Sequence, residues 1–176
     1  MFTEELMNRF GFVIFSTIGT LALAVMPTGV VAQQKSLKEQ LVGTWILIEA
    51  IDVAADGSKT NPWGANPKGT YMFDTSGHFT QMLIRSDLPK IANRAQGGTP
   101  EQNKAVVSGA IAMYGTYSVN DTEKTITVRF EGSTFSSFNG TEGKRIITSL
   151  GADEMKTTNP ATSTGTKAES VWRRAK

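Results

Sequence analysis

Short segments in which apolar and polar residues alternate make up most of the chain from residue 44 onward. Such alternation is typical of antiparallel strands with one face on a core, and turn residues bound each segment. The segments predict eight strands, at 44–53, 69–75, 78–85, 115–119, 124–131, 143–150, 154–158 and 167–174. Short strands joined mainly by hairpin-length turns favour an all-β fold, either an up-and-down antiparallel barrel or a sandwich.

A short helix is predicted just before the first strand. Ser36 and Glu39 have the spacing of a capping box, in which each residue's side chain binds the other's backbone N–H. This spacing predicts one or two helical turns that end before Gly43, and the helix would act as a plug or lid.

A longer helix is predicted for "TPEQNKAVVSGAIAMYG", residues 99–115. Thr99 is the expected N-cap, and Pro100 occupies the first helical position, where its missing N–H costs nothing. This helix would interrupt the series of strands. The residues expected to share its apolar face are Ala105, Val106, Ala110 and Met113.

The first 32 residues carry a different pattern. A long apolar run without charges follows Arg9, and Pro27 and a small-residue exit at Ala32 come after it. This layout predicts a secretory signal peptide at 1–32 that is cleaved on export. Its first residue is either Met1 or Met7. The alternative is an uncleaved membrane anchor. We expect cleavage, no stable membrane anchor afterwards, and a bacterial protein that is periplasmic or secreted.

Composition and charge fit one globular domain at residues 33–176, since 39% of the residues are hydrophobic and 19% are charged. The basic residues are scattered and the formal net charge is only +2, so no nucleic-acid partner is predicted. The absence of cysteine excludes disulfides and thiolate chemistry. His78 is the single histidine, so a histidine cluster is excluded, and we predict neither a metal nor a cofactor.

The two ends of the strand series carry residues suited to closing a barrel. Gly43 and Trp45 stand at the first strand, and Arg173 and Arg174 stand in the last. First and last strands are neighbours in a closed barrel, so a guanidinium from either arginine would cover the indole and seal one end by a cation–π contact. The alternative is that Trp45 is an ordinary core aromatic.

The "GTW" near the start and the basic residue in the last strand resemble the lipocalins. Taken in order, "LVGTWILIEA", "NPKGTYMFDTSGHFTQMLIR", "MYGTYSVND", "EGSTFSSFNGTEGKR" and "VWRR" resemble more closely a bacterial and fungal family of lipocalin-like domains. The resemblance covers about residues 37–174. It implies an eight-stranded barrel with a ligand cavity, and it implies little about chemistry.

Three functions remain open at this point. The first is a binding module that holds a small hydrophobic molecule in the barrel interior, and we expect this more than an enzyme. The second is a cofactor-independent isomerase or cyclase that confines an apolar substrate, with His78, Tyr117 and Arg129 as weak catalytic candidates. The third is an envelope interaction protein that uses its outer surface and has a filled barrel.

Side chains that can line an apolar cavity and orient a guest form the predicted binding set. Arg129 and Arg145 are each either a solvated surface residue or a clamp for a ligand carboxylate. The loop "NPWGANP", which carries Trp63, either overhangs the mouth or packs its own tryptophan. The predicted ligand-binding residues are Tyr71, Phe73, His78, Gln81, Leu83, Arg85, Tyr114, Tyr117, Phe130 and Arg145.

Overall fold

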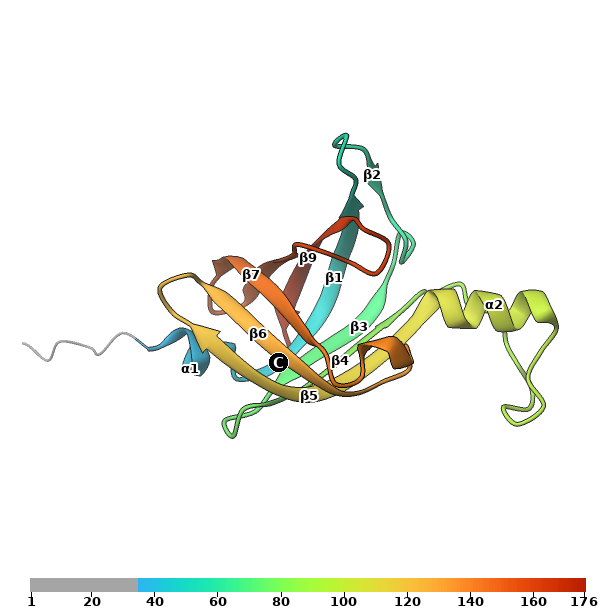
Figure 1. Ribbon diagram of the computed structural model, residues 1–176, viewed down its shortest axis with the longest axis horizontal. Helices are drawn as coiled ribbons and strands as arrows, with labels where there is room; N and C mark the ends of the chain where they lie inside the picture. Colours follow the sequence, from blue (N-terminus) through green and yellow to red (C-terminus); the bar gives the residue numbers. More distant parts are fainter. Residues whose placement is uncertain (1–34) are drawn as a thin grey trace, which may run out of the picture. The chain divides into compact units, whose positions relative to one another are not determined.

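The computed structural model describes residues 35–176, so the signal peptide predicted at 1–32 lies outside the described residues. Strands dominate this part of the chain (Figure 1). They are β1 (Gly43–Val53), β2 (Lys59–Thr60), β3 (Lys68–Phe73), β4 (His78–Ile84), β5 (Ala110–Asn120), β6 (Thr125–Ser133), β7 (Glu142–Leu150), β8 (Glu154–Asn159) and β9 (Lys167–Arg174).

The strands form one closed antiparallel sheet. From β3 to β9 each strand pairs with the next one along the chain, β1 pairs with β3, and β9 returns to pair with β1. The two-residue β2 pairs with the end of β1, and the other eight strands make the barrel. Figure 1 shows β9 beside β1, as the pairing of Leu47 with Trp172 requires. Closure leaves no long unpaired edge, and the predicted all-β barrel is confirmed.

Two α-helices lie at opposite ends of the barrel in the view of Figure 1. α1 (Leu37–Leu41) has the predicted capping box, with Ser36 Oγ accepting from Glu39 N at 3.2 Å. α2 (Pro100–Gly109) begins at the predicted N-cap, Thr99. Within residues 35–176, neither helix has the length and apolar character needed to cross a membrane.

The end of α2 corrects the predicted helix over 99–115. The helix stops at Gly109, and residues 110–115 belong to β5. These residues pair with β4, where Met113 lies opposite Gln81, and burial leaves Met113 only 5% exposed. Cross-strand hydrogen bonds and burial therefore outweigh the local helical pattern, because propensity is a weak preference that tertiary contacts override.

On β1 and β9, the inward-facing side chains become smaller from one end of the barrel to the other. Large aromatic side chains fill the end covered by α1, and a mixture of apolar and polar side chains lines a cavity at the end near α2. The interior therefore divides into a packed half and a hollow half. From the packed half to the hollow half, the inward positions are Trp45, Leu47, Ala50 and Asp52 on β1, and Trp172, Ser170 and Ala168 on β9.

Candidate functional site

The packed end of the barrel is sealed by a tryptophan and an arginine. The Trp45 ring is fully buried, and its Nε1 donates a hydrogen bond to the Leu41 carbonyl of α1 at 2.8 Å. The Arg174 guanidinium lies over this ring, with Cζ 4.0 Å from the ring centroid. Of the two arginines considered for this contact, Arg173 is exposed on the outside and Arg174 makes it.

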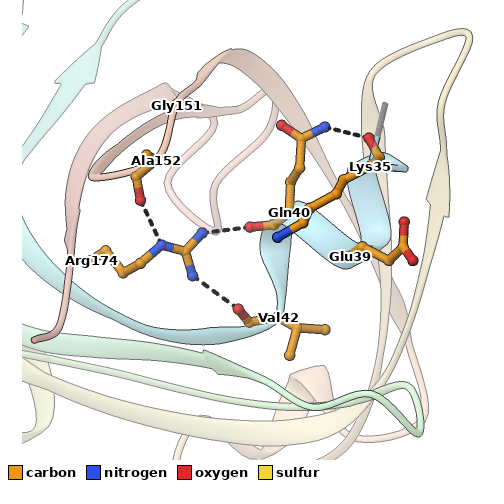
Figure 2. Close-up of a pocket in the computed structure, with 7 residues that line it drawn as sticks. All are labelled: Lys35, Glu39, Gln40, Val42, Gly151, Ala152 and Arg174. Atoms are coloured by element: carbon orange, nitrogen blue, oxygen red, sulfur yellow. Dashed lines mark hydrogen bonds between the residues drawn. The ribbon is translucent and has the colours of Figure 1, made fainter. Parts of the chain in front are cut away.

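Arg174 also closes the end by hydrogen bonding, as Figure 2 shows. Its Nε donates to the Ala152 carbonyl at 2.6 Å, and its Nη1 and Nη2 donate to the carbonyls of Val42 at 2.9 Å and Gln40 at 2.6 Å. A depression of about 510 Å³ lies among these groups. The guanidinium faces carbonyls that already accept its hydrogens, so we assign this depression a structural role.

The hollow half contains a second cavity, of about 590 Å³, that opens at the other end of the barrel. Its walls combine apolar and polar side chains, and the apolar ones contribute the larger share of the surface. Apolar members include Ala50, Leu83, Ile111, Met113 and Phe138, and polar members include Asp52, Gln81, Arg145, Thr157 and Asn159. An apolar cavity with a few polar groups is the usual design of a small-molecule site.

Arg145 is a charged residue of the cavity wall, and the sequence did not decide whether its side chain faces the interior or the solvent. It lies opposite Ile126, a fully buried residue, so it points into the barrel. The guanidinium keeps some accessible surface because it faces the cavity, although protein surrounds it on its other sides. Burial lowers the pKa of Arg145 from its usual range, and the Tyr71 hydroxyl acts in the opposite direction.

Tyr71 projects inward from β3, four places along the sheet from β7, which carries Arg145. Its ring packs on Phe73 and Trp172, with centroid distances of 4.1 and 5.4 Å, and only 1% of the residue is exposed. The hydroxyl has no hydrogen-bond partner, and within residues 35–176 no other fully buried side-chain oxygen or nitrogen lacks one. Burial raises the pKa of Tyr71 to about 12, while the nearby Arg145 lowers it.

Substituting Tyr71 by phenylalanine should stabilise the barrel at neutral pH by about 1 kcal/mol, because it removes a buried, unpaired hydroxyl and keeps the ring. The same variant should lose less stability in alkali. The folded pKa of about 12 exceeds the ordinary value of 10.0, so between these pH values only the unfolded chain releases the proton. Wild-type stability should therefore fall by roughly 2–3 kcal/mol from pH 10 to 12 through this group.

Urea unfolding of both proteins at pH 7, 10 and 11.5 measures these effects. A Tyr71→Phe variant that is 1 kcal/mol or more less stable at pH 7 would contradict them, since the hydroxyl would then have a favourable partner.

Six of the predicted ligand-binding residues face the barrel interior, and three of these line the cavity. Gln81, Leu83 and Arg145 line it directly. The other three, Tyr71, Phe73 and Phe130, belong to the buried core. Phe130 stacks on Phe138, a cavity residue, at a centroid distance of 5.3 Å.

Tyr117 is inward-facing but lies at the packed end. Its hydroxyl donates to the Asp74 carbonyl at 2.7 Å, and its ring packs edge-on against Phe73. It is 7% exposed and is absent from the cavity wall. This corrects its prediction as a ligand-binding or catalytic residue, because the hydrogen bond ties it to the β3–β4 turn.

The structure corrects the predicted site at His78 and Arg129, because neither residue lines the cavity. His78 lies at the β3–β4 turn of the packed end, where its exposed ring meets Ser76 Oγ at 2.9 Å and Asp74 at 3.5 Å. Arg129 is exposed on β6 and pairs with Glu142 at 3.7 Å. Both point outward because their neighbours in the strand face the core and strand residues alternate.

The structure also corrects the predicted site at Tyr114 and Arg85, which do not line the cavity. Tyr114 is 54% exposed, and its ring lies on Gly132 at the outer face, where a Cβ would be only 2.3 Å from the ring. A bulge between Tyr114 and Gly115 lies at this point of the β5–β6 ladder. Arg85 follows the end of β4, and its guanidinium binds the Asp87 carboxylate at 2.6 Å.

Sequence reasoning missed the polar residues of β8 that line the cavity. Thr157 and Asn159 continue the inward face that Met155 begins, with Thr157 Oγ1 accepting from Trp172 Nε1 at 3.1 Å. The alternation in "EMKTTN" contains this signal, since every second residue shares a face. Trp63, considered as a residue of the mouth, does line the cavity beside Pro62.

A closed antiparallel barrel with one sealed end and an apolar cavity at the other defines the class of lipocalin-like barrels. A sequence model of the lipocalin-like domain matches residues 42–175, and the chain belongs to this family. No curated protein matches the chain.

Among solved structures, a lipocalin-like protein from Bacteroides uniformis ATCC 8492 is 14% identical, with a TM-score of 0.44 over 77% of this chain and 99% of that one. A de novo designed fluorescence-activating β-barrel is also 14% identical, with a TM-score of 0.43 over 80% of this chain and 99% of that one. Bovine odorant binding protein, in complex with a selenium-containing odorant, is 13% identical, with a TM-score of 0.42 over 82% of this chain and 75% of that one.

Proposed function

We propose that this barrel binds a small hydrophobic molecule in its interior. The observation that carries the proposal is the cavity of about 590 Å³, lined by residues such as Leu83, Met113 and Phe138. Small-molecule pockets commonly measure roughly 300–1,000 Å³. Burying an apolar guest would contribute about 25 cal/mol per Å² of apolar surface removed from water.

The rim of the cavity supports access for an apolar guest from this end. Val107 on α2 is 77% exposed and Phe135 before β7 is 44% exposed, and both line the cavity. Trp63 stands on the loop between β2 and β3 at the same rim. Exposed apolar side chains around a polar-edged opening are typical of ligand grooves.

The other hypotheses receive less support. None of the three catalytic candidates of the isomerase hypothesis, His78, Tyr117 and Arg129, lines the cavity. The envelope interaction hypothesis expected a filled barrel, whereas this interior is hollow in the half near α2.

Filling the cavity should abolish binding of a neutral apolar probe. Ser170 lines the cavity on β9 between Ala50 and Thr157, so Ser170→Phe places a ring in the space that the guest would occupy. N-phenyl-1-naphthylamine becomes fluorescent in apolar surroundings, and its titration measures the dissociation constant. We expect binding at one site in the wild type and a loss of at least tenfold in the variant.

Ser118→Phe is the matched control, because Ser118 is exposed on the outer face of β5. Its titration should equal that of the wild type, and circular dichroism should show that both variants keep the barrel. Equal binding by Ser170→Phe and the wild type would place the probe outside the cavity and overturn the proposal.

A further inference from the structure

We infer that the guest is an apolar molecule with one carboxylate group, and that Arg145 binds this carboxylate inside the cavity. The inference rests on the proposed function and specifies the class of ligand. It follows from Arg145, a charged side chain of the cavity wall whose hydrogen-bonding capacity the described chain uses only in part.

Arg145 has three N–H groups without a partner in the described chain. A guanidinium carries five N–H donors. Nη1 uses both of its hydrogens, on the Lys144 carbonyl at 2.9 Å and on Asn159 Oδ1 at 3.1 Å. Nε and Nη2 donate no hydrogen bond within residues 35–176. These are the two nitrogens on one edge of the guanidinium that can bind both oxygens of a carboxylate.

The charge of Arg145 is also unmatched. Within residues 35–176 its guanidinium makes no ion pair, whereas Arg85 and Arg129 each pair with a carboxylate. Asp52 lines the same cavity, but it accepts a hydrogen bond from Thr166 at 2.8 Å and forms no ion pair with Arg145. An unpaired charge that protein surrounds on most sides is costly, and an anionic guest in the cavity would reduce that cost.

The lack of a side chain at Gly143 leaves room for the Arg145 guanidinium. Gly143 shares the inward face of β7 with Arg145, and a Cβ there would lie 3.1 Å from Arg145 Nη1 and 3.1 Å from the Phe130 ring. The glycine therefore lets the guanidinium lie against the strand and keeps the space of the cavity free.

One guanidinium in an apolar cavity favours a singly charged, planar anion. A carboxylate matches the guanidinium in both charge and geometry. A phosphate monoester would carry additional negative charge that no other cation of the cavity wall neutralises, since Arg145 is the only lysine or arginine among the described residues that line it.

The test compares three ligands with the same alkyl chain, namely dodecanoate, dodecan-1-ol and dodecyl phosphate, by displacement of N-phenyl-1-naphthylamine at pH 7.5. The wild type should bind dodecanoate roughly ten- to hundredfold more tightly than the alcohol, the range expected for a hydrogen bond to a charged group. Arg145→Met should lose this preference and still bind the alcohol. Arg129→Met, the matched outer-surface control, should keep it.

A further variant protects the test if Arg145→Met fails to fold. Arg145→Lys should keep part of the preference, because the positive charge remains and the planar, two-pronged geometry of the guanidinium is lost. Tyr71→Phe changes a buried residue that does not line the cavity, so it should keep the wild-type preference.

Equal affinity of the wild type for the acid and the alcohol would overturn the inference, as would a preference that survives in Arg145→Met. Tighter binding of dodecyl phosphate would overturn the choice of a carboxylate. Failure of the wild type to bind any of these compounds or the probe would instead overturn the proposed function.

Discussion

Replacing Arg174 with alanine is expected to lower the free energy of unfolding by about 2–4 kcal/mol. The change removes the guanidinium that covers Trp45 at 4.0 Å and that donates to the carbonyls of Gln40, Val42 and Ala152. Charge-assisted hydrogen bonds contribute about 1.5–3 kcal/mol each, and partial exposure reduces this value here. Urea unfolding monitored by tryptophan fluorescence gives the change.

Arg173→Ala is the control for this prediction, because Arg173 is the neighbouring arginine in the same strand and its side chain is exposed. We expect a change within about 0.5 kcal/mol, as for other surface substitutions. Arg174→Lys should recover only a minor part, since an ammonium cannot reach three carbonyls in the geometry of the planar guanidinium. Equal stabilities of Arg173→Ala and Arg174→Ala would show that the contact does not seal the barrel.

Replacing Gly115 with alanine is expected to destabilise the barrel by about 3 kcal/mol, at the upper end of the cost of overpacking. Gly115 lies at the bulge of the β5–β6 ladder. A Cβ at this position would be 1.9 Å from the Arg129 carbonyl oxygen and 2.9 Å from the Glu131 nitrogen. Both are backbone atoms, so the strand itself would have to move.

Thermal and urea unfolding test this value against Gly151→Ala. At Gly151 the nearest atom to an added Cβ is the Glu154 carbonyl oxygen at 3.7 Å, an ordinary contact. The control should therefore remain within about 0.5 kcal/mol of the wild type. A similarly small effect at Gly115 would mean that the bulge does not need the glycine.

The barrel could be predicted from the sequence because its signals are local. Alternation along "TITVRF" indicates which face is inside, and the structure buries Ile126, Val128 and Phe130 as expected. The predicted capping box at Ser36 and N-cap at Thr99 also depend on a few adjacent residues, and both are present. These local patterns are reliable because the interactions that they predict form between residues that are close in the sequence.

The end of α2 could not be predicted in the same way. "SGAIAMYG" has a helical pattern of apolar residues, and only the pairing of residues 110–116 with β4 makes it a strand. That pairing joins segments separated by α2 and its preceding loop. A long-range contact therefore determines the conformation of residues 110–116, and the local sequence pattern does not indicate that contact.

The candidate site was only partly predictable for a related reason. His78 and Tyr114 have side chains whose chemistry suits a binding site, yet strand alternation and the bulge place them outside. Arg145 could not be decided, because the sequence does not show which face of β7 is inside when both faces carry charged residues. The unpaired state of its guanidinium becomes visible only when all neighbouring strands are in place.

The most direct test of the account is a crystal structure of the protein grown with N-phenyl-1-naphthylamine. We predict one probe molecule inside the barrel, in contact with Leu83, Met113 and Phe138, with Trp45 and Arg174 still sealing the opposite end. A probe found only on the outer surface, or an interior closed by collapsed side chains, would contradict the claim that this barrel is a container for an apolar guest.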